Sequence, residues 1–252
     1  MVLVLVFIIS LLPYIFIYSF LKKRKKEDTE YQTICTKALK LGLLQCVGFV
    51  ILTSGCLYIT HIILKLVGVN NFVRNIYYNY IVLALSEEMV KYSMLKRLLK
   101  NNNYSYTWLD IVSFMGIIGI GFGLSESLVY AIGANAGMML VRGISAMHSS
   151  YGLLMGFLLG KGKYTNKRLY TFLAIFIPFI LHGTYDFCIL AGMPIFLLVF
   201  LVFVIWMYIN SIKKLKLVAT NNRSLYRENK YCAYCGAQAT GVFCGHCGHK
   251  IQ

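Results

Sequence analysis

The sequence is poor in acidic residues and in charge of either sign. It has nine Asp and Glu residues among 252, and only 13% of all residues are charged. Hydrophobic residues make up 58% of the chain, and its mean hydropathy is +0.66. A water-soluble domain cannot bury that much apolar surface, so the composition excludes an ordinary soluble protein and predicts an integral membrane protein.

The apolar runs also lack period-two alternation, which argues against a transmembrane barrel and favours helices. Each run is about 20 residues long, enough for a helix to cross the hydrocarbon core. We therefore expect an all-α polytopic membrane protein with about seven transmembrane helices. The expected spans are roughly 2–20, 43–66, 74–97, 109–131, 137–160, 169–190 and 193–211.

The formal net charge of +16 does not indicate nucleic-acid binding, because of where the charge lies. Lys and Arg cluster between the apolar runs, at 22–26, 96–97, 161–168 and 213–216. Such loops follow the positive-inside rule and lie against anionic lipid. The first run has no basic residue before it and no small-residue cleavage site, so we expect a retained helix. The predicted topology is N-out and C-in.

The end of the chain has a different character. Residues 212–230 read as a polar linker between a membrane domain, 1–211, and a small cytoplasmic domain, 231–252. The latter contains two Cys-x-x-Cys-Gly knuckles, which predict a zinc ribbon with structural Zn²⁺ and a docking or regulatory role. A cytoplasmic location disfavours the alternatives, disulfides or a redox pair. The four predicted zinc ligands are Cys232, Cys235, Cys244 and Cys247.

Most of the few acids outside the basic loops fall inside expected spans. Glu87, Glu88, Glu126 and Asp186 do so, whereas Asp110 stands at the start of a span and fits a helix-start role. A buried acid costs about 2.5–3.5 kcal/mol at the centre of a membrane helix, so such residues usually face partners inside the bundle. Lys91 is spaced to pair with Glu87 or with Glu88 on one helix.

Two histidines lie in the later spans. His148 is in line with glycines at 152, 156 and 160, a stripe that should pack against another helix and turn this histidine inward. His182 and Asp186 are four residues apart, the spacing at which a carboxylate can orient an imidazole. Phe122 shares a helical face with Glu126, so four spans each contribute inward-facing acid or imidazole groups.

This ordered set resembles the motifs of the PrsW family of bacterial intramembrane proteases, which is related to the CAAX prenyl endopeptidase-like proteases. The motifs are EExxK at 87–91, FxxxE at 122–126, a lone histidine at 148 and HxxxD at 182–186. The wider group usually has arginine one position later in the first motif, and histidine in place of Glu126. Those departures favour the PrsW branch.

The resemblance implies peptide hydrolysis within the membrane by glutamate-activated water, with no metal needed for catalysis. It assigns the general base to Glu87, with Glu88 as the second choice. His182, oriented by Asp186, would hold the water or polarise the scissile carbonyl. Glu126 and His148 would complete the water site, with Lys91 and Phe122 supporting it.

The resemblance also implies a membrane-anchored protein substrate, such as an anti-sigma factor, in a bacterial cell membrane. A cytoplasmic protein could bind the ribbon, and no nucleic-acid partner is expected. Three alternatives stay open: a metal-dependent hydrolase, a proton- or cation-coupled transporter, and a non-catalytic scaffold. The sequence has no HExxH spacing, which counts against the first of them.

Overall fold

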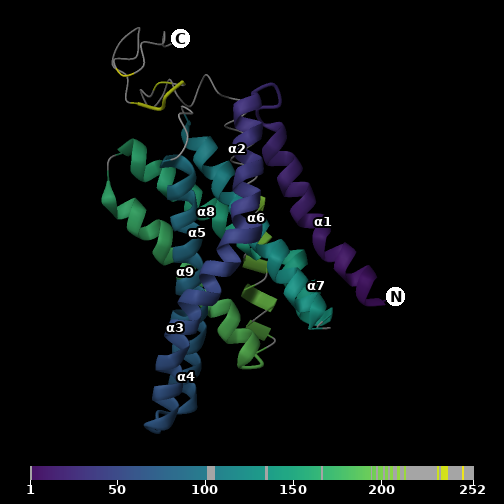
Figure 1. The fold of residues 1–252 in the computed structure, drawn as a ribbon, viewed down its shortest axis with the longest axis vertical. Helices are drawn as coiled ribbons and strands as arrows, with labels where there is room; N and C mark the ends of the chain where they lie inside the picture. The colour runs from purple at the N-terminus through teal and green to yellow at the C-terminus, as the bar shows by residue number, and fades with distance from the viewer. Residues whose placement is uncertain are drawn as a thin grey trace.

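The structure is a computed structural model of the chain (Figure 1). It describes residues 2–100, 106–133, 136–165 and 167–193, with shorter stretches beyond them. All regular secondary structure in these residues is helical, which confirms the predicted all-α class. The elements are α1 Val2–Lys23, α2 Thr29–Lys40, η1 Leu41–Cys46, α3 Val47–Leu66, α4 Asn71–Ile76, η2 Tyr77–Leu85, α5 Ser86–Lys100, α6 Trp108–Ile132, α7 Ala136–Ser145, α8 Met147–Thr165 and α9 Arg168–Leu190.

Three helices in the described part of the chain are long and apolar enough to cross a membrane. They are Leu3–Lys23, Trp108–Ile132 and Arg168–Leu190. The other expected spans lie on helices that are shorter or interrupted, and the last one, 193–211, lies partly outside the described residues. The described residues thus contain three candidate membrane-spanning helices, while the predicted number of seven stays a prediction.

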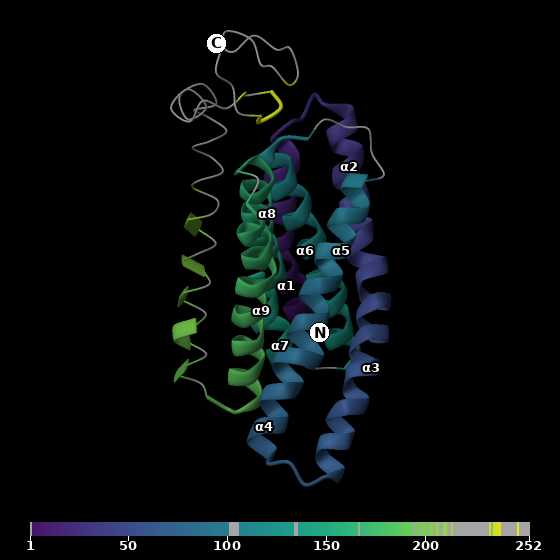
Figure 2. The ribbon, with the colours of Figure 1, turned by 90° about the vertical axis from the view of Figure 1, so that its left-hand side faces the viewer.

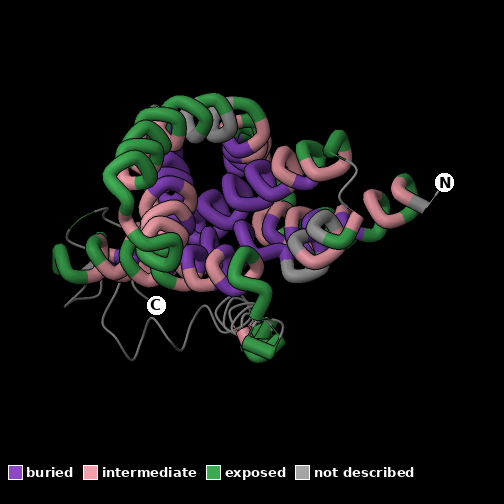
Figure 3. Tube along the Cα trace, turned by 90° about the horizontal axis from the view of Figure 1, so that it is seen from below, coloured by how far each residue is buried: buried purple, intermediate pink, exposed green. Residues whose placement is uncertain are grey.

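Helix α6 forms the centre of the bundle. In its most apolar stretch 78% of the residues are buried, against 17% in the corresponding stretch of α1 and 39% in that of α9. Figure 3 shows the consequence, with buried segments in the middle and exposed ones around them. Large apolar side chains cover the outer faces of α1, α3 and α9, for example Phe16, Leu52 and Phe172. A polytopic protein presents such faces to lipid.

Glycine allows α8 to pack unusually close to α6. A Cβ atom on Gly119 of α6 would lie 2.2 Å from the carbonyl oxygen of His148, and one on Gly152 of α8 would lie 2.6 Å from that of Met115. Both distances are far inside van der Waals contact, so these positions require glycine. The predicted packing of the glycine stripe against another helix is confirmed, and it turns His148 toward the bundle interior.

The predicted helix-start role of Asp110 is also confirmed. Its side chain forms a capping box with Thr107, the N-cap of α6. The same carboxylate is fully buried and pairs with Arg24 and, at 2.9 Å, with Lys25. These contacts tie the turn between α1 and α2 to the start of the central helix.

Two of the irregularities in the expected spans lie next to residues that the sequence analysis selected. The expected span 137–160 is divided into α7 and α8 at Ala146, which is buried and has a positive φ of 44°. The expected span 74–97 contains the π-helical segment η2 directly before Ser86. The wider turns of a π-helix change the direction in which the following side chains point.

The basic clusters near residues 22–26, 96–100 and 161–168 gather at one end of the bundle (Figure 2). The end of α3 and the beginning of α4 lie at the opposite end, where they project as a hairpin beyond the other helices. The described basic clusters therefore lie together at one end of the folded bundle, as the positive-inside rule predicts.

A Gly119→Ala variant should lower the melting temperature of the purified protein markedly. The new methyl group meets a backbone carbonyl, which cannot rotate away, and overpacking of this kind costs about 1–3 kcal/mol. Gly55→Ala is the matched control, because a Cβ there meets nothing within 4 Å on an exposed face of α3. Equal melting temperatures for the two variants would contradict the close α6–α8 contact.

Candidate active site

Acidic and imidazole side chains from four helices converge in the middle of the bundle. Helix α5 supplies Glu87 and Glu88, α6 supplies Glu126, α8 supplies His148, and α9 supplies His182 with Asp186. All but the half-buried Glu126 are buried. The structure thus brings together every intramembrane residue that the sequence analysis selected as catalytic.

Lys91 pairs with Glu88 and not with Glu87. Its ammonium nitrogen lies 2.6 Å from Glu88 Oε1, and both side chains are 0% exposed. The sequence spacing allowed either glutamate, and the structure selects the one three residues away. Of the two adjacent glutamates, Glu87 is therefore the one that forms no ion pair with Lys91.

Glu88 also fixes the orientation of His182. Nδ1 of His182 lies 2.9 Å from Glu88 Oε1, and a carboxylate can only accept, so Nδ1 donates its hydrogen there. Nε2 consequently faces the other way, 3.7 Å from Glu87 Oε2 and 3.3 Å from Asp186 Oδ2, without forming a hydrogen bond. The predicted His182–Asp186 proximity is present, with Glu88 as an additional orienting partner.

His148 is oriented in the same manner by a different acid. Its Nε2 donates to Glu126 Oε2 at 2.5 Å. Its Nδ1 lies 2.9 Å from the ammonium of Lys91, which can only donate, so Nδ1 is an acceptor with its lone pair directed into the cluster. Glu126 and Lys91 thus fix Nδ1 of His148 as the unprotonated nitrogen, and Glu88 turns Nε2 of His182 away from itself. These two nitrogens, Nδ1 of His148 and Nε2 of His182, face the same region.

Glu87 lies between these two nitrogens. Its Oε2 atom is 3.9 Å from His148 Nδ1 and 3.7 Å from His182 Nε2, and it is buried without a hydrogen-bond partner. One ligand atom from each of these three residues lies within 4.8 Å of the others. Such an arrangement can hold a divalent metal ion or a polarised water molecule.

Aromatic rings enclose the cluster. Phe122 contacts the ring of His148 edge-on, with centroids 4.7 Å apart, and the Lys91 ammonium lies 4.7 Å above the same phenyl ring. Tyr151, fully buried, lies 5.5 Å from the ring of His182. The sequence analysis missed Tyr151, although its position three residues after His148 puts it on the same face of α8.

The first knuckle of the tail is partly described. The backbone N–H of Tyr234 donates to Cys232 Sγ at 3.4 Å, and Gly236 has a positive φ of 71°. Glycine after the second cysteine therefore makes the tight turn expected of a zinc knuckle. Cys244 and Cys247 lie outside the described residues, so the zinc ribbon stays a prediction.

A family model described as "PrsW family intramembrane metalloprotease" matches residues 37–209, more than half of the chain and all of the cluster. The chain belongs to the PrsW family. The resemblance inferred from the motifs is thereby confirmed, and with it the prediction of an intramembrane protease.

Proteins of this family named "Protease PrsW" are similar to the chain over part of their length. The one from Clostridioides difficile is 26% identical over 164 residues, 61% of this chain and 69% of the relative. The one from Oceanobacillus iheyensis is 30% identical, over 53% of this chain and 64% of the relative. The one from Bacillus subtilis is 29% identical, over 43% and 53%. The chain thus spans between half and two thirds of most relatives' length, and no solved structure matches it.

The PrsW description names a metalloprotease, whereas the sequence analysis expected catalysis without a metal. The residues present fit a metal: Glu87 Oε2 and His182 Nε2 are buried without hydrogen bonds, and carboxylates orient both imidazoles as in many metal sites. One feature opposes it, because Lys91 already donates to His148 Nδ1.

Replacing Lys91 by methionine should lower the free energy of unfolding by about 3–5 kcal/mol, because Glu88 would stay buried without its cation. Adding Glu88→Gln to this variant should restore much of the loss, since the uncompensated charge is then removed. Glu87→Gln alone should cost much less, because Lys91 does not pair with Glu87. Chemical denaturation in detergent measures all four proteins, and equal losses for Lys91→Met with and without Glu88→Gln would refute the pairing.

Proposed function

We propose that this PrsW-family chain is a multi-pass protein of the bacterial cell membrane that hydrolyses a peptide bond of a membrane-anchored protein substrate, such as an anti-sigma factor. The observation that carries the proposal is the convergence of Glu87, His148 and His182 in a buried cluster at the centre of the bundle. A transporter would also use buried acids, but the protease family membership favours hydrolysis.

The basic end of the bundle supports a cytoplasmic position for that end. Because Lys and Arg stay on the cytoplasmic side, the loop after α1, the end of α5 and the α8–α9 turn face the cytoplasm in this proposal. Seven spans would then place the tail, with its linker at 212–230 and its ribbon at 231–252, on the same side. A zinc-loaded ribbon there would provide a docking surface for a cytoplasmic partner.

In the proposed mechanism, Glu87, His148 and His182 would hold a divalent metal ion. Such an ion would supply Lewis-acid polarisation of the scissile carbonyl and of the attacking water. Glu88 and Glu126 accept hydrogen bonds from Nδ1 of His182 and Nε2 of His148, so the opposite nitrogens face the region around Glu87. The surrounding helices exclude bulk water, which strengthens every electrostatic contact in the site.

The metal-free mechanism is the second candidate. Glu87 Oε2 is buried and makes no hydrogen bond, and Lys91 is committed to Glu88, so Glu87 is the carboxylate able to take a proton from water. His182 Nε2, 3.7 Å away, would then orient the water or bind the developing oxyanion. The two mechanisms give Glu87 different tasks, ligand or base, with the same partners.

Glu87→Gln and His182→Ala should each lower the cleavage rate by a factor of about 10²–10⁴, since each removes a group that acts on the reacting water or carbonyl. Comparative membrane proteomics of cells carrying wild type or Glu87→Gln is the measurement: a single-span protein should accumulate at full length in the variant. Thr33→Ala, an exposed change on α2, is the control. Unchanged cleavage by a correctly inserted Glu87→Gln protein would refute the proposal.

Metal analysis separates the two mechanisms. A Cys232→Ala/Cys235→Ala protein should lose the ribbon metal yet keep a metal ion that disappears when His182→Ala is added, because the two sites use different ligands. Elemental analysis of the purified full-length proteins provides the measurement. An active Cys232→Ala/Cys235→Ala protein that contains no metal would favour the metal-free mechanism instead.

A further inference from the structure

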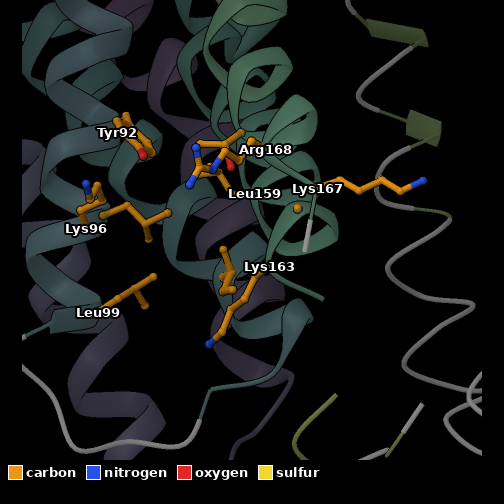
Figure 4. A pocket seen from close by; sticks show the side chains of 11 residues that line it. Tyr92, Lys96, Leu99, Leu159, Lys163, Lys167 and Arg168 are labelled. Carbon is orange, nitrogen blue, oxygen red and sulfur yellow. The ribbon is translucent and has the colours of Figure 1, made fainter. Parts of the chain in front are cut away.

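A cavity separate from the catalytic cluster lies at the basic end of the bundle, between the end of α5, the end of α8 and the start of α9. Its volume is about 240 Å³. Figure 4 shows the side chains that line it. The catalytic cluster contributes none of the lining residues, so the sequence motifs of the family do not explain this cavity.

Three cations surround the cavity, one from each of these helices. Lys96 belongs to α5, Lys163 to α8, and Arg168 is the first residue of α9. A fourth basic residue, Lys167, extends away from the other labelled side chains (Figure 4). No carboxylate is among the described residues that line the cavity. Cations brought together without an acid repel one another and attract an anion.

The rest of the lining is chiefly apolar. Leu95, Leu99, Ile111 and Leu159 face the cavity together with the side chains of Tyr92 and Thr171. A cavity of this size is below the range of about 300–1,000 Å³ that holds a drug-sized ligand, so it suits one headgroup and not a peptide segment. Cations beside apolar surface match a ligand with a phosphate next to hydrocarbon.

The surroundings indicate the source of that phosphate. Leu169 and Phe172 of α9, which flank the lining residues Arg168 and Thr171, are 60% and 58% exposed. Large apolar side chains exposed beside the cavity place it next to the lipid. Basic pockets between membrane helices bind anionic headgroups in this way.

We propose that this cavity binds the phosphate headgroup of an anionic phospholipid, held by Lys96, Lys163 and Arg168. The occupant links three helices that also carry the catalytic cluster: α5 holds Glu87 and Glu88, α8 holds His148, and α9 holds His182. Lys96 is eight residues from Glu88, roughly 12 Å along the helix. A bound headgroup offsets the repulsion at this end and draws the catalytic helices together.

Lipid binding is the first part of the test. The purified full-length protein is titrated with phosphatidylglycerol or phosphatidylcholine, and bound lipid is counted by native mass spectrometry. Lys96→Gln/Arg168→Gln should bind phosphatidylglycerol on the order of 20-fold more weakly than wild type, at roughly fivefold for each charge removed. Lys96→Arg/Arg168→Lys keeps the charges and should bind nearly as wild type does.

The matched control removes the same number of charges outside the cavity. Lys23→Gln/Lys26→Gln should bind phosphatidylglycerol like wild type, because both lysines are exposed, at the end of α1 and in the turn after it, and neither lines the cavity. Equal loss in both double variants would overturn the proposal, because the attraction would then be a general property of the basic surface. Binding of inorganic phosphate or an acidic peptide at this cavity in preference to phosphatidylglycerol would overturn it as well.

The effect on catalysis rests on the proposed proteolysis and is measured separately. Phosphatidylglycerol vesicles should raise the cleavage rate of wild type over phosphatidylcholine vesicles, and this increase should disappear in Lys96→Gln/Arg168→Gln. An increase that survives in this variant would refute the coupling between the cavity and the catalytic helices. Absence of cleavage in every lipid would refute the proposed function, while the binding measurement would still decide the lipid site.

Discussion

The carboxylate of Glu88 accepts hydrogen bonds from Lys91 on its own helix and from His182 on α9, at 2.6 and 2.9 Å. These two bonds decide the rest of the site. They neutralise Glu88, they join α5 to α9, and they turn Nε2 of His182 toward Glu87. Because a buried carboxylate without partners is costly, the geometry is held in place by the cost of breaking either bond.

The sequence predicted those parts of the site that depend on spacing along one helix. Lys91 lies one turn from both glutamates and Asp186 one turn from His182, and the structure shows both proximities. Spacing on one helix cannot show which glutamate takes the lysine, because that choice depends on His182 from α9. The pairing of Glu126 with His148 is likewise a contact between helices, which no local pattern encodes.

The break at Ala146 and the π-helical segment before Ser86 could not be predicted from the sequence, for a different reason. Ala146 has a positive φ. Glycine or asparagine at this position would have suggested that conformation from the sequence, whereas alanine rarely adopts it. The π-helical segment before Ser86 contains no glycine or proline that would mark a change of helical period. Both irregularities lie next to residues of the buried cluster, on α5 and α8, where departures from regular geometry are expected to aim side chains.

The charges in the cluster argue for an additional positive group. Glu87, Glu88, Glu126 and Asp186 bring four carboxylates together, and Lys91 is the one ammonium that the described residues place among them. Such an excess of negative charge in a low dielectric has to be offset by protons or by a bound cation. A divalent ion would offset it at the three atoms that converge, whereas protons would occupy the lone pairs that catalysis needs. The electrostatics therefore favour the proposed metal-dependent mechanism, in which a metal ion would have to displace Lys91 from Nδ1 of His148.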